Sequence, residues 1–457
     1  MRVLFAKEHR WQCWLDVEAA LAVAEAECGV IPAAAAEAIE SAATLAALDI
    51  TRIERGIAES SHPLMALVTE LSAAAGEHGG WVHWGATTQN ITQTGDVLVL
   101  REAHYRILRL LAGVLTAAAD LAERTAGMLA AGRTHGQHAV PITFGFKPAG
   151  WIDELGRHVI RLRAAEGRVF TAMTGGAAGT FASLGEAGPL VQDAVAARLG
   201  LAPMAVPSRA VADSFAEYVC LLGLLGATGT RIAHEVYQLM STELAEASEP
   251  VPPGTIGSST MPHKRNPQLS DDCITIGAQL RTLVPLALEG MVHDHEVDGA
   301  HSAMLDDALE RACVLTGDLL ARLEVILSGL DVDPARMRAN LALSGGMISS
   351  EEVMLELGRA IGRQTAHEVI YQAARADGVT FADALKRDPR VTAHLDPAAI
   401  DHLLDPARHT GLSAGIARAA AARARATARE IILTGRSVNV LRSAHAHSAH
   451  VRRTDRV

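Results

Sequence analysis

The 457-residue chain is poor in aromatic residues, in lysine and in cysteine. Aromatic residues make up 4% of the chain, whereas alanine dominates an apolar content of 49%, a balance that favours helices over sheets. The five cysteines are scattered and lack CxxC spacing, which argues against a disulfide framework. No apolar run reaches the roughly 18 residues of a membrane helix, and the N-terminus lacks a signal-peptide pattern. We therefore expect a soluble, cytoplasmic protein without a membrane partner.

Positive charge is scarce as well. The formal net charge is −11, whereas a dedicated nucleic-acid-binding protein would normally show a basic face. Of the 41 basic residues only four are lysines, at positions 7, 147, 264 and 386. These counts argue against nucleic acid as a partner and leave room for a local basic pocket that binds a small anion.

Long stretches with helical periodicity and without proline cover about 96–130, 208–249 and 303–330. A first helix is predicted within 9–30, and Pro32 stands where a second would begin. Helices far above the average of about 11–12 residues need partner helices, which other subunits can supply.

We predict an all-α protein of three helical domains. They are an N-terminal domain over 1–95, a central long-helix bundle over 96–342 and a small domain of short helices over 343–434. The polar, His- and Arg-rich residues 435–457 are predicted to be a disordered tail.

Three polar breaks between the predicted helices, at 83–96, 132–147 and 254–267, hold most of the candidate chemistry. The first, HWGATTQNITQTGD, places Thr87, Thr88 and Gln89 before a helix start, where free N–H groups can bind an anion. Ordinary helix capping is the alternative interpretation of these side chains. In the second break, GRTHGQHAVPITFGFK, two histidines three residues apart at a helix boundary raise the odds of catalysis only moderately.

The third break, GTIGSSTMPHKRNP, combines glycines, serine hydroxyls and cationic donors in a mixture too specific for a solvated loop. Its segment GSSTMPHKRNP (257–267) resembles the signature of the fumarase/aspartase superfamily, and the other two breaks match further segments of that superfamily in the same order. The resemblance runs from WLDVEAAL to LLDPARHTG and is nearest to the branch of adenylosuccinate lyase and 3-carboxy-cis,cis-muconate cycloisomerase.

This resemblance implies a homotetramer in which central domains form a twenty-helix bundle and three subunits share each active site. The implied substrate is a small dicarboxylate. The implied reaction cleaves a C–N or C–O bond beside a carboxylate by anti elimination, through an aci-carboxylate intermediate, and usually releases fumarate. It needs no cofactor.

The resemblance also implies roles for individual residues. Ser258 matches the general base that removes the Cβ proton, and its alkoxide would need nearby amides and cations for stabilisation. Lys264 and Asn266 match the residues that hold the substrate carboxylate as it gains charge. His135 matches a histidine that protonates the leaving group, and Asp271 matches its acidic partner.

The glycine-rich approach at 254–257 matches a mobile loop that closes over the substrate. His62 resembles a histidine near the site in this branch, although a histidine before a proline can instead cap a helix. The remaining positions expected to bind the substrate are Thr87, Thr88, Gln89, Thr134, Gln137, Ser259 and Arg265.

Departures from the family pattern bear on the substrate. Where adenylosuccinate lyases hold a nucleotide phosphate, this chain has Glu351 and Glu352, which would repel it. In the stretch SRAVADSFAEY, Ala210, Val211 and Ser214 replace residues that normally contact substrate. We therefore predict a lyase that removes an amine, ammonia or nitrite from a substituted succinate or aspartate, as nitrosuccinate lyases do with nitrite.

Three alternatives stay open. The first is a 3-carboxy-cis,cis-muconate cycloisomerase: the late segments look more like those of cycloisomerases, although cycloisomerases tend to lack the histidine of RTHGQHA. The second, weaker alternative is an adenylosuccinate lyase. The third is a catalytically silent scaffold. The histidines of HDHEVDGAH (293–301) could ligate zinc, but alternate residues on a helix diverge, so a polar loop is favoured and no metal is predicted.

Overall fold

The computed structural model describes residues 1–251, 254, 260–261 and 263–454, with side chains as far as 434. Helices make up 72% of it, which confirms the all-α prediction. The chain divides into two compact units, each built from three segments of the sequence. The first unit is Met1–Leu108, His158–Ala227 and Ile276–Leu319, and the second is Arg109–Arg157, Thr228–Thr275 and Leu320–Val457. The domain boundaries predicted from the sequence stay predictions.

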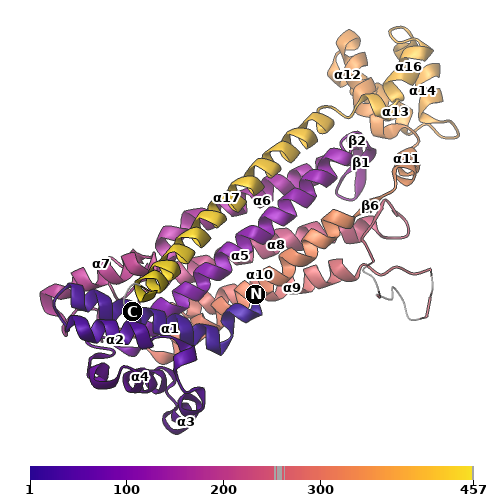
Figure 1. Ribbon diagram of the computed structural model, residues 1–457. Coiled ribbons are helices and arrows are strands. Elements are labelled where there is room, and N and C mark those ends of the chain that lie inside the picture. The colour runs from indigo at the N-terminus through magenta and orange to yellow at the C-terminus, as the bar shows by residue number, and fades with distance from the viewer. Residues whose placement is uncertain (252–253, 255–259, 262, 455–457) are drawn as a thin grey trace. The chain divides into compact units, whose positions relative to one another are not determined.

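The long helices are divided between the two units: α5 (Thr88–Arg124), α6 (Phe146–Val169), α8 (Asp213–Leu239), α9 (Gln268–Glu289) and α10 (Gly299–Gly329) (Figure 1). Of these, α5, α8 and α10 confirm the proline-free helices predicted within 96–130, 208–249 and 303–330. Their buried faces carry apolar residues such as Leu111, Leu115 and Leu323, all fully buried. Removing this apolar surface from water is what holds helices of such length together.

The first unit also contains shorter elements. Its helices are η1 (Arg2–Phe5), α1 (Lys7–Glu27), α2 (Ala33–Ala42), η2 (Leu45–Ala47), α3 (Ile50–Ser60), α4 (Pro63–Ala74), η3 (Gly76–Trp81), η4 (Gly185–Ala187) and α7 (Gly188–Leu199). A short parallel pair joins β3 (Thr171–Ala172) to β4 (Ala202–Pro203). Pro32 is the N-cap of α2, as predicted, because its extended backbone leads directly into the helix.

The second unit contains two antiparallel pairs: β1 (Leu129–Thr134) with β2 (Gln137–Thr143), and β5 (Ala247–Ser248) with β6 (Asp331–Val332). Its other elements are α11 (Pro334–Ala342), η5 (Met347–Ser349), α12 (Ser350–Ile361), α13 (Arg363–Ala374), α14 (Phe381–Arg387), α15 (Pro389–Thr392), α16 (Pro397–Leu404), η6 (Pro406–Arg408) and α17 (Ser413–Thr454). The helices α12, α13, α14 and α16 form a group of their own (Figure 1), built around buried Val353, Leu357, Phe381, Leu385 and Ile400.

Aspartate–proline pairs start several of these short helices. Asp333, Asp388 and Asp396 each accept a backbone N–H of the following turn, and a proline follows at the first helical position. The aspartate satisfies a free donor and the proline has the required φ, so the pair fixes the start of the helix. Asp388 and Asp396 thus start α15 and α16, within the region 343–434 where short helices were predicted.

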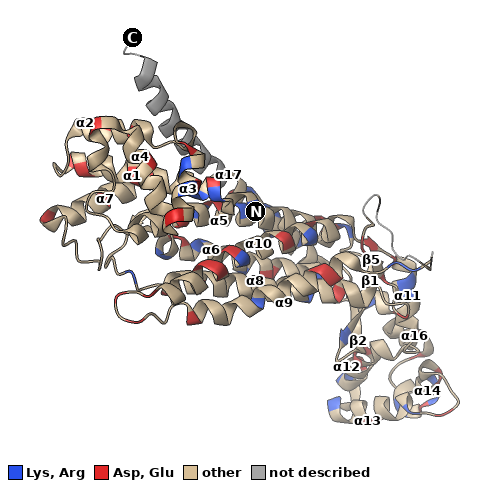
Figure 2. Ribbon diagram, turned by 90° about the horizontal axis from the view of Figure 1, so that it is seen from below, with Lys and Arg blue, Asp and Glu red and all other residues tan. Residues whose placement is uncertain are grey.

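Acidic and basic residues alternate along the helices in the view of Figure 2 rather than gathering into a field of one sign. Among the residues that the structure describes, no helix combines the length and the hydropathy that a transmembrane span requires.

Candidate active site

The first polar break ends earlier than the sequence suggests, because α5 already begins at Thr88. Asn90 fixes this start: its Oδ1 accepts the N–H of Thr87 at 3.0 Å and the N–H of Gly176 at 3.1 Å. Asn90 is fully buried, so its side chain can satisfy these amides where water cannot. Thr88 and Gln89 thus occupy the first turn of a long helix, where the free backbone amides and the helix dipole favour an anion.

His62 joins α4 to this helix start. Its Nδ1 accepts the N–H of Met65 at 3.2 Å, so the capping role considered from the sequence is present. Because Nδ1 accepts, the neutral ring carries its proton on Nε2, which lies 3.4 Å from Thr88 Oγ1 and donates to it. His62 therefore caps one helix and orients a hydroxyl at the start of another.

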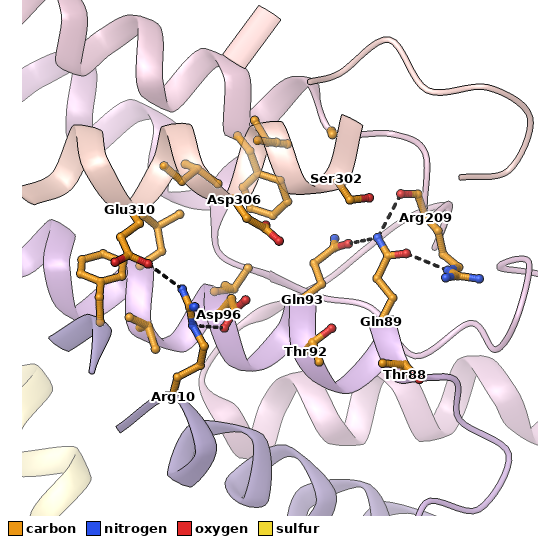
Figure 3. Close-up of a pocket in the computed structure, with 18 of the residues that line it drawn as sticks. Arg10, Thr88, Gln89, Thr92, Gln93, Asp96, Arg209, Ser302, Asp306 and Glu310 are labelled. Atoms are coloured by element: carbon orange, nitrogen blue, oxygen red, sulfur yellow. Dashed lines mark hydrogen bonds and ion pairs between the residues drawn. The ribbon is translucent and has the colours of Figure 1, made fainter. Parts of the chain in front are cut away.

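Arg209 completes this group, and sequence reasoning did not single it out. Its Nε donates to Gln89 Oε1 at 2.8 Å, and Gln89 Nε2 donates to the Arg209 carbonyl at 3.2 Å and to Gln93 Oε1 at 2.9 Å (Figure 3). Burial lowers the pKa of the Arg209 guanidinium from its ordinary value. The signal in the sequence that could have identified Arg209 was its position directly before Ala210 and Val211, in the stretch where the chain departs from the family pattern.

We call Thr87, Thr88, Gln89, His62 and Arg209 the cradle. Thr88, Gln89 and Arg209 line a cavity of about 260 Å³ in the first unit. This end of the cavity offers amide, hydroxyl and guanidinium donors, which suit a carboxylate.

The other end of the same cavity is acidic. Arg10 lies between Asp96 and Glu310, with nitrogen–oxygen distances of 3.1 and 3.2 Å (Figure 3). Burial raises the pKa of Asp96 and of Asp306, and the attraction of Arg10 offsets this only in part. An anionic substrate would therefore bind by the Arg209 end, away from these carboxyl groups.

The second polar break is a β-hairpin, not a boundary between helices. His135 and Gly136 have φ of 51° and 74°, and they connect the paired residues Thr134 and Gln137. Two residues with positive φ form the turn whose twist suits a two-residue hairpin, and glycine in the second position makes it accessible. Thr134, His135 and Gln137 are all exposed at its tip.

An ion pair with a buried carboxylate supports this hairpin next to its turn. Arg133 donates through both terminal nitrogens to Glu246, at 3.0 and 2.5 Å, and Asn340 Nδ2 donates to the same carboxylate at 2.8 Å. Burial opposes ionisation of Glu246, but these hydrogen bonds outweigh it and lower its pKa. Lys147, at the start of α6, pairs instead with Glu235 of α8.

The third break leads into α9. Ser258 and Ser259 lie outside the described residues. Lys264 and Arg265 are exposed and Asn266 is half-buried, and α9 begins two residues later. In the described part of the chain, the side chains of Lys264, Asn266 and Asp271 make no hydrogen bond.

Glu249, which sequence reasoning missed, fixes the start of α9. Its buried carboxylate accepts the N–H of Leu269 at 2.8 Å, the N–H of Ser270 at 3.0 Å and the Ser270 hydroxyl at 2.8 Å. A carboxylate at this position satisfies free amides and complements the helix dipole. Glu249 thereby positions the segment that carries Lys264 and Asn266, which we call the signature segment (260–261 and 263–267 as described).

His135 and Asp271, expected to pair, are both exposed, and no hydrogen bond joins them within the described chain. The structure thus shows a bonded, partly buried cradle in the first unit. In the second unit it shows an exposed hairpin tip and an exposed signature segment.

Comparison with known proteins shows the family to which this chain belongs. Residues 1–281 match a family described as "Lyase", and residues 346–420 match one described as "Adenylosuccinate lyase C-terminus". The chain belongs to this lyase family, within the fumarase/aspartase superfamily and its branch of adenylosuccinate lyase and 3-carboxy-cis,cis-muconate cycloisomerase. It is an enzyme with the elimination chemistry of the fumarate lyases, which act on small dicarboxylates.

Individual relatives span almost the whole chain. An N-acetyl-S-(2-succino)cysteine lyase from Enterococcus italicus is 40% identical over 91% of this chain and 92% of its own. A 3-carboxy-cis,cis-muconate cycloisomerase from Pseudomonas aeruginosa is 38% identical over 90% and 91%, respectively. The crystal structure of a fumarate lyase from Mesorhizobium sp. BNC1 is similar with a TM-score of 0.86 and 33% identity, over 92% of this chain and 97% of that one.

Proposed function

We propose that this enzyme cleaves a thioether: it eliminates a thiol from an S-(2-succino)cysteine-type substrate and releases fumarate. The observation that carries the proposal is the similarity, at 40% identity over nine tenths of both chains, to a lyase named for such a substrate. The sequence alone pointed to an amine, ammonia or nitrite as the leaving group, whereas the similarity to that lyase favours a thiol.

The proposed reaction is an anti elimination. A base removes a proton from the methylene carbon of the succinyl group, and the adjacent carboxylate takes up charge as an aci-carboxylate. The electron pair then forms the double bond of fumarate while the C–S bond breaks and the thiolate leaves. A thiolate, with a conjugate-acid pKa of about 8.5, leaves with far less need of protonation than an amine.

Within this reaction we assign Ser258 as the base and Lys264 and Asn266 as donors to the carboxylate that gains charge. Each such donor is typically worth on the order of 10²–10³ in rate. His135 assists the leaving group. The cradle binds the other carboxylate, through Arg209 and the first turn of α5.

Two acidic residues at the start of α12 support a leaving group without phosphate. Glu351 and Glu352 lie in the first turn of α12, the part of a helix that would otherwise attract an anion. Glu352 also lies 3.5 Å from the His409 ring nitrogen. Two carboxylates at this position would repel a nucleotide phosphate.

We further propose that the active site is composite, as the family resemblance implies. Three subunits of a homotetramer, joined through a twenty-helix bundle of their long helices, would each contribute one part. The exposure of His135 and Lys264 in a single chain supports this, because a second subunit can cover them.

A substrate panel tests the proposal. Purified enzyme is given succinates that carry N-acetylcysteinyl, cysteinyl, amino, nitro, hydroxy and bulkier amine groups, with 3-carboxymuconate in parallel. Fumarate is followed by ultraviolet absorbance and free thiol by a colorimetric thiol reagent. We expect fumarate and thiol in equal amounts from the thioethers, and neither from the Ser258→Ala variant.

Other outcomes identify the alternatives. Fumarate from an amino or nitro compound, with the thioethers untouched, would reject the thiol leaving group and keep the lyase. Consumption of 3-carboxymuconate alone would identify a cycloisomerase, the activity of the relative that is 38% identical.

A further inference from the structure

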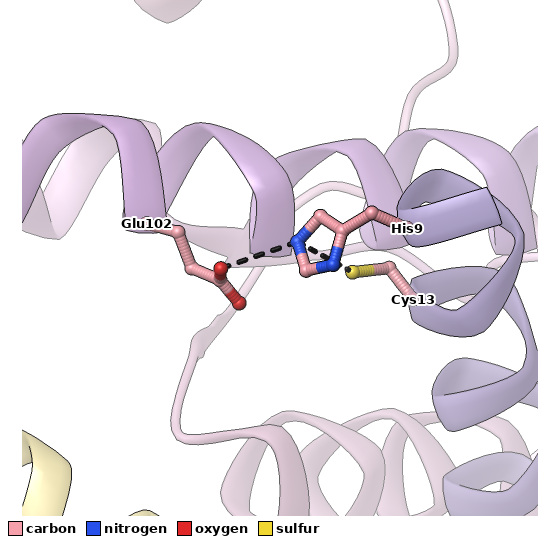
Figure 4. A group of neighbouring side chains, drawn as sticks. All are labelled: His9, Cys13 and Glu102. Carbon is pink, nitrogen blue, oxygen red and sulfur yellow. Dashed lines mark hydrogen bonds and ion pairs between the residues drawn. The ribbon is translucent and has the colours of Figure 1, made fainter. Parts of the chain in front are cut away.

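His9, Cys13 and Glu102, none of which is a cradle residue, bring three different metal-ligating atoms together (Figure 4). His9 Nε2 lies 3.2 Å from Glu102 Oε2 and 4.0 Å from Cys13 Sγ. All three donor atoms lie within 4.8 Å of one another, and all three residues belong to the first unit. His9 and Cys13 come from α1, and Glu102 comes from α5.

The spacing in the sequence suits a shared ion. His9 and Cys13 are four residues apart on one helix, so their side chains project from the same face. In a tetrahedral zinc site, bonds of about 2.0–2.1 Å to nitrogen and about 2.3 Å to sulfur place ligand atoms roughly 3.3–3.7 Å apart. The separations from His9 Nε2 to Glu102 and to Cys13, 3.2 and 4.0 Å, bracket that range, and the third pair lies within 4.8 Å, so side-chain rotations that draw Cys13 and Glu102 together would complete the site.

The surroundings suit a site that a metal ion can enter. Cys13 is 4% exposed, whereas the side chains of Glu102 and His9 are 20% and 33% exposed. The sulfur is thus shielded from water and oxidants, and the approach over the imidazole stays open for the ion and for a water molecule as fourth ligand. Nitrogen, thiolate and carboxylate together form a donor set typical of zinc rather than of magnesium or calcium.

A second cluster, His293, Asp298 and His301, is explained without a metal. Asp298 accepts the N–H of His301 at 2.9 Å and the N–H of Asp294 at 3.1 Å, directly before α10 begins at Gly299. These hydrogen bonds are those of a helix cap, and they lower the pKa of the Asp298 carboxyl. A substitution of His301 therefore serves as a control for the loss of a histidine outside the proposed site.

We propose that His9, Cys13 and Glu102 bind one Zn²⁺ per chain and thereby fasten α1 to α5. The ion takes no part in the elimination. Its binding releases the thiol proton, because the thiolate is the ligand. The competing structural explanation is a His9–Glu102 ion pair beside a cysteine that serves only as a small apolar residue.

The test is metal titration of the full-length protein after treatment with a chelator. Zinc is titrated against a chromophoric chelator, and Co²⁺ is added separately because a thiolate–cobalt bond gives a charge-transfer absorption. We expect one equivalent of zinc per chain and a thiolate band with cobalt. Both should be lost in Cys13→Ser and in His9→Gln, whereas Cys28→Ser and His301→Asn should keep them.

A thermal melt distinguishes a lost site from a lost fold. Zinc should raise the Tm of the wild type, because a ligand of the native state stabilises it, and should leave the Tm of a folded His9→Gln variant unchanged. The proposal is wrong if the wild type binds no zinc at micromolar concentration. It is equally wrong if Cys13→Ser and His9→Gln retain the zinc, or if only His301→Asn loses it.

Discussion

The cradle and the signature segment differ in how completely contacts within a single chain hold their side chains in place. In the cradle, Gln89 makes hydrogen bonds to Arg209 and Gln93, and Thr88 lies against His62. In the signature segment, Lys264 is exposed and its side chain makes no hydrogen bond within the described residues. One part is already fixed before the substrate arrives, and the other presents its donors outward.

This difference suggests a division of labour. Side chains held by their neighbours lose little freedom on binding, so a preformed cradle suits recognition of a carboxylate that does not react. In the proposed composite site, donors that face outward can meet the charge that develops during elimination once another subunit excludes water. Changes in the signature segment and the hairpin should therefore act on kcat, and changes in the cradle should act on KM.

The largest expected effect is that of Ser258→Ala. Loss of a positioned general base typically costs about 10²–10⁴ in rate, so we expect kcat for fumarate release to fall by roughly 10³ with little change in KM. Steady-state kinetics with the thioether substrate measure this. Ser241→Ala is the matched control, because within the described residues the Ser241 hydroxyl donates to the Gln238 carbonyl of its own turn. A Ser258→Ala enzyme with normal turnover would remove Ser258 from the mechanism.

The next effect concerns His135→Asn and depends on the leaving group. If His135 protonates the departing atom, its loss should cost about 10²-fold with a poorly leaving alkyl thiol and much less with an acidic aryl thiol. A series of S-succinyl thiols of graded pKa measures this as a steeper dependence of kcat on thiol pKa. His138→Asn, two residues beyond the turn, is the control. An equal loss for every thiol would instead indicate a role in binding.

In the cradle, Arg209→Ala should raise KM for the thioether by about 10–100-fold and leave kcat within a few-fold, since a hydrogen bond to a charged group contributes about 1.5–3 kcal/mol. Arg198→Ala, which removes an exposed pair with Glu27, should change neither constant. A fall in kcat alone for Arg209→Ala would contradict the division between recognition and chemistry.

The last expected effect is on stability instead of activity and arises in α1, which belongs to the same unit as the cradle. Glu25 is fully buried, and in the described structure neither carboxyl oxygen has a hydrogen-bond partner. Burial, with the nearby Glu18 carboxylate, raises the pKa of Glu25 from 4.5 to about 8. The folded state keeps a proton that the unfolded chain releases, so stability falls as pH rises from about 4.5 to about 8.

Glu25→Gln should remove this contribution, which is on the order of a few kcal/mol at pH 8 and near zero below pH 4.5. The measurement is Tm at pH 5 and at pH 8 for the wild type, for Glu25→Gln and for the exposed control Glu37→Gln. The Tm of Glu25→Gln relative to that of the wild type should be higher at pH 8 than at pH 5. The same Tm difference between variant and wild type at both pH values would mean that Glu25 is ionised in the folded state.

Much of the fold was readable in the sequence, because long helices and capping residues carry local signals. The proline-free runs predicted α5, α8 and α10, and the short helices expected within 343–434 are present as α12 to α16. The hairpin at 129–143 was missed, since its turn depends on the backbone of His135 and Gly136 rather than on an apolar pattern. Arg209 and Glu249 were missed because their partners, Gln89 and Ser270, are far away in the sequence.

The central claim is that a cradle from one copy and a signature segment from another complete a single fumarate-forming site. Thr88→Ala/Gln89→Ala, whose raised KM leaves it nearly inactive at thioether concentrations far below the wild-type KM, and Ser258→Ala, which lacks the base, are unfolded together, refolded and assayed for fumarate at such a concentration. Random assembly should restore roughly a quarter of the sites, because each intact part is then supplied by half of the copies. A mixture of Ser258→Ala with Lys264→Ala, both altered in one segment, should stay inactive. Fumarate release no higher than in the unmixed variants would show that each chain builds its own site.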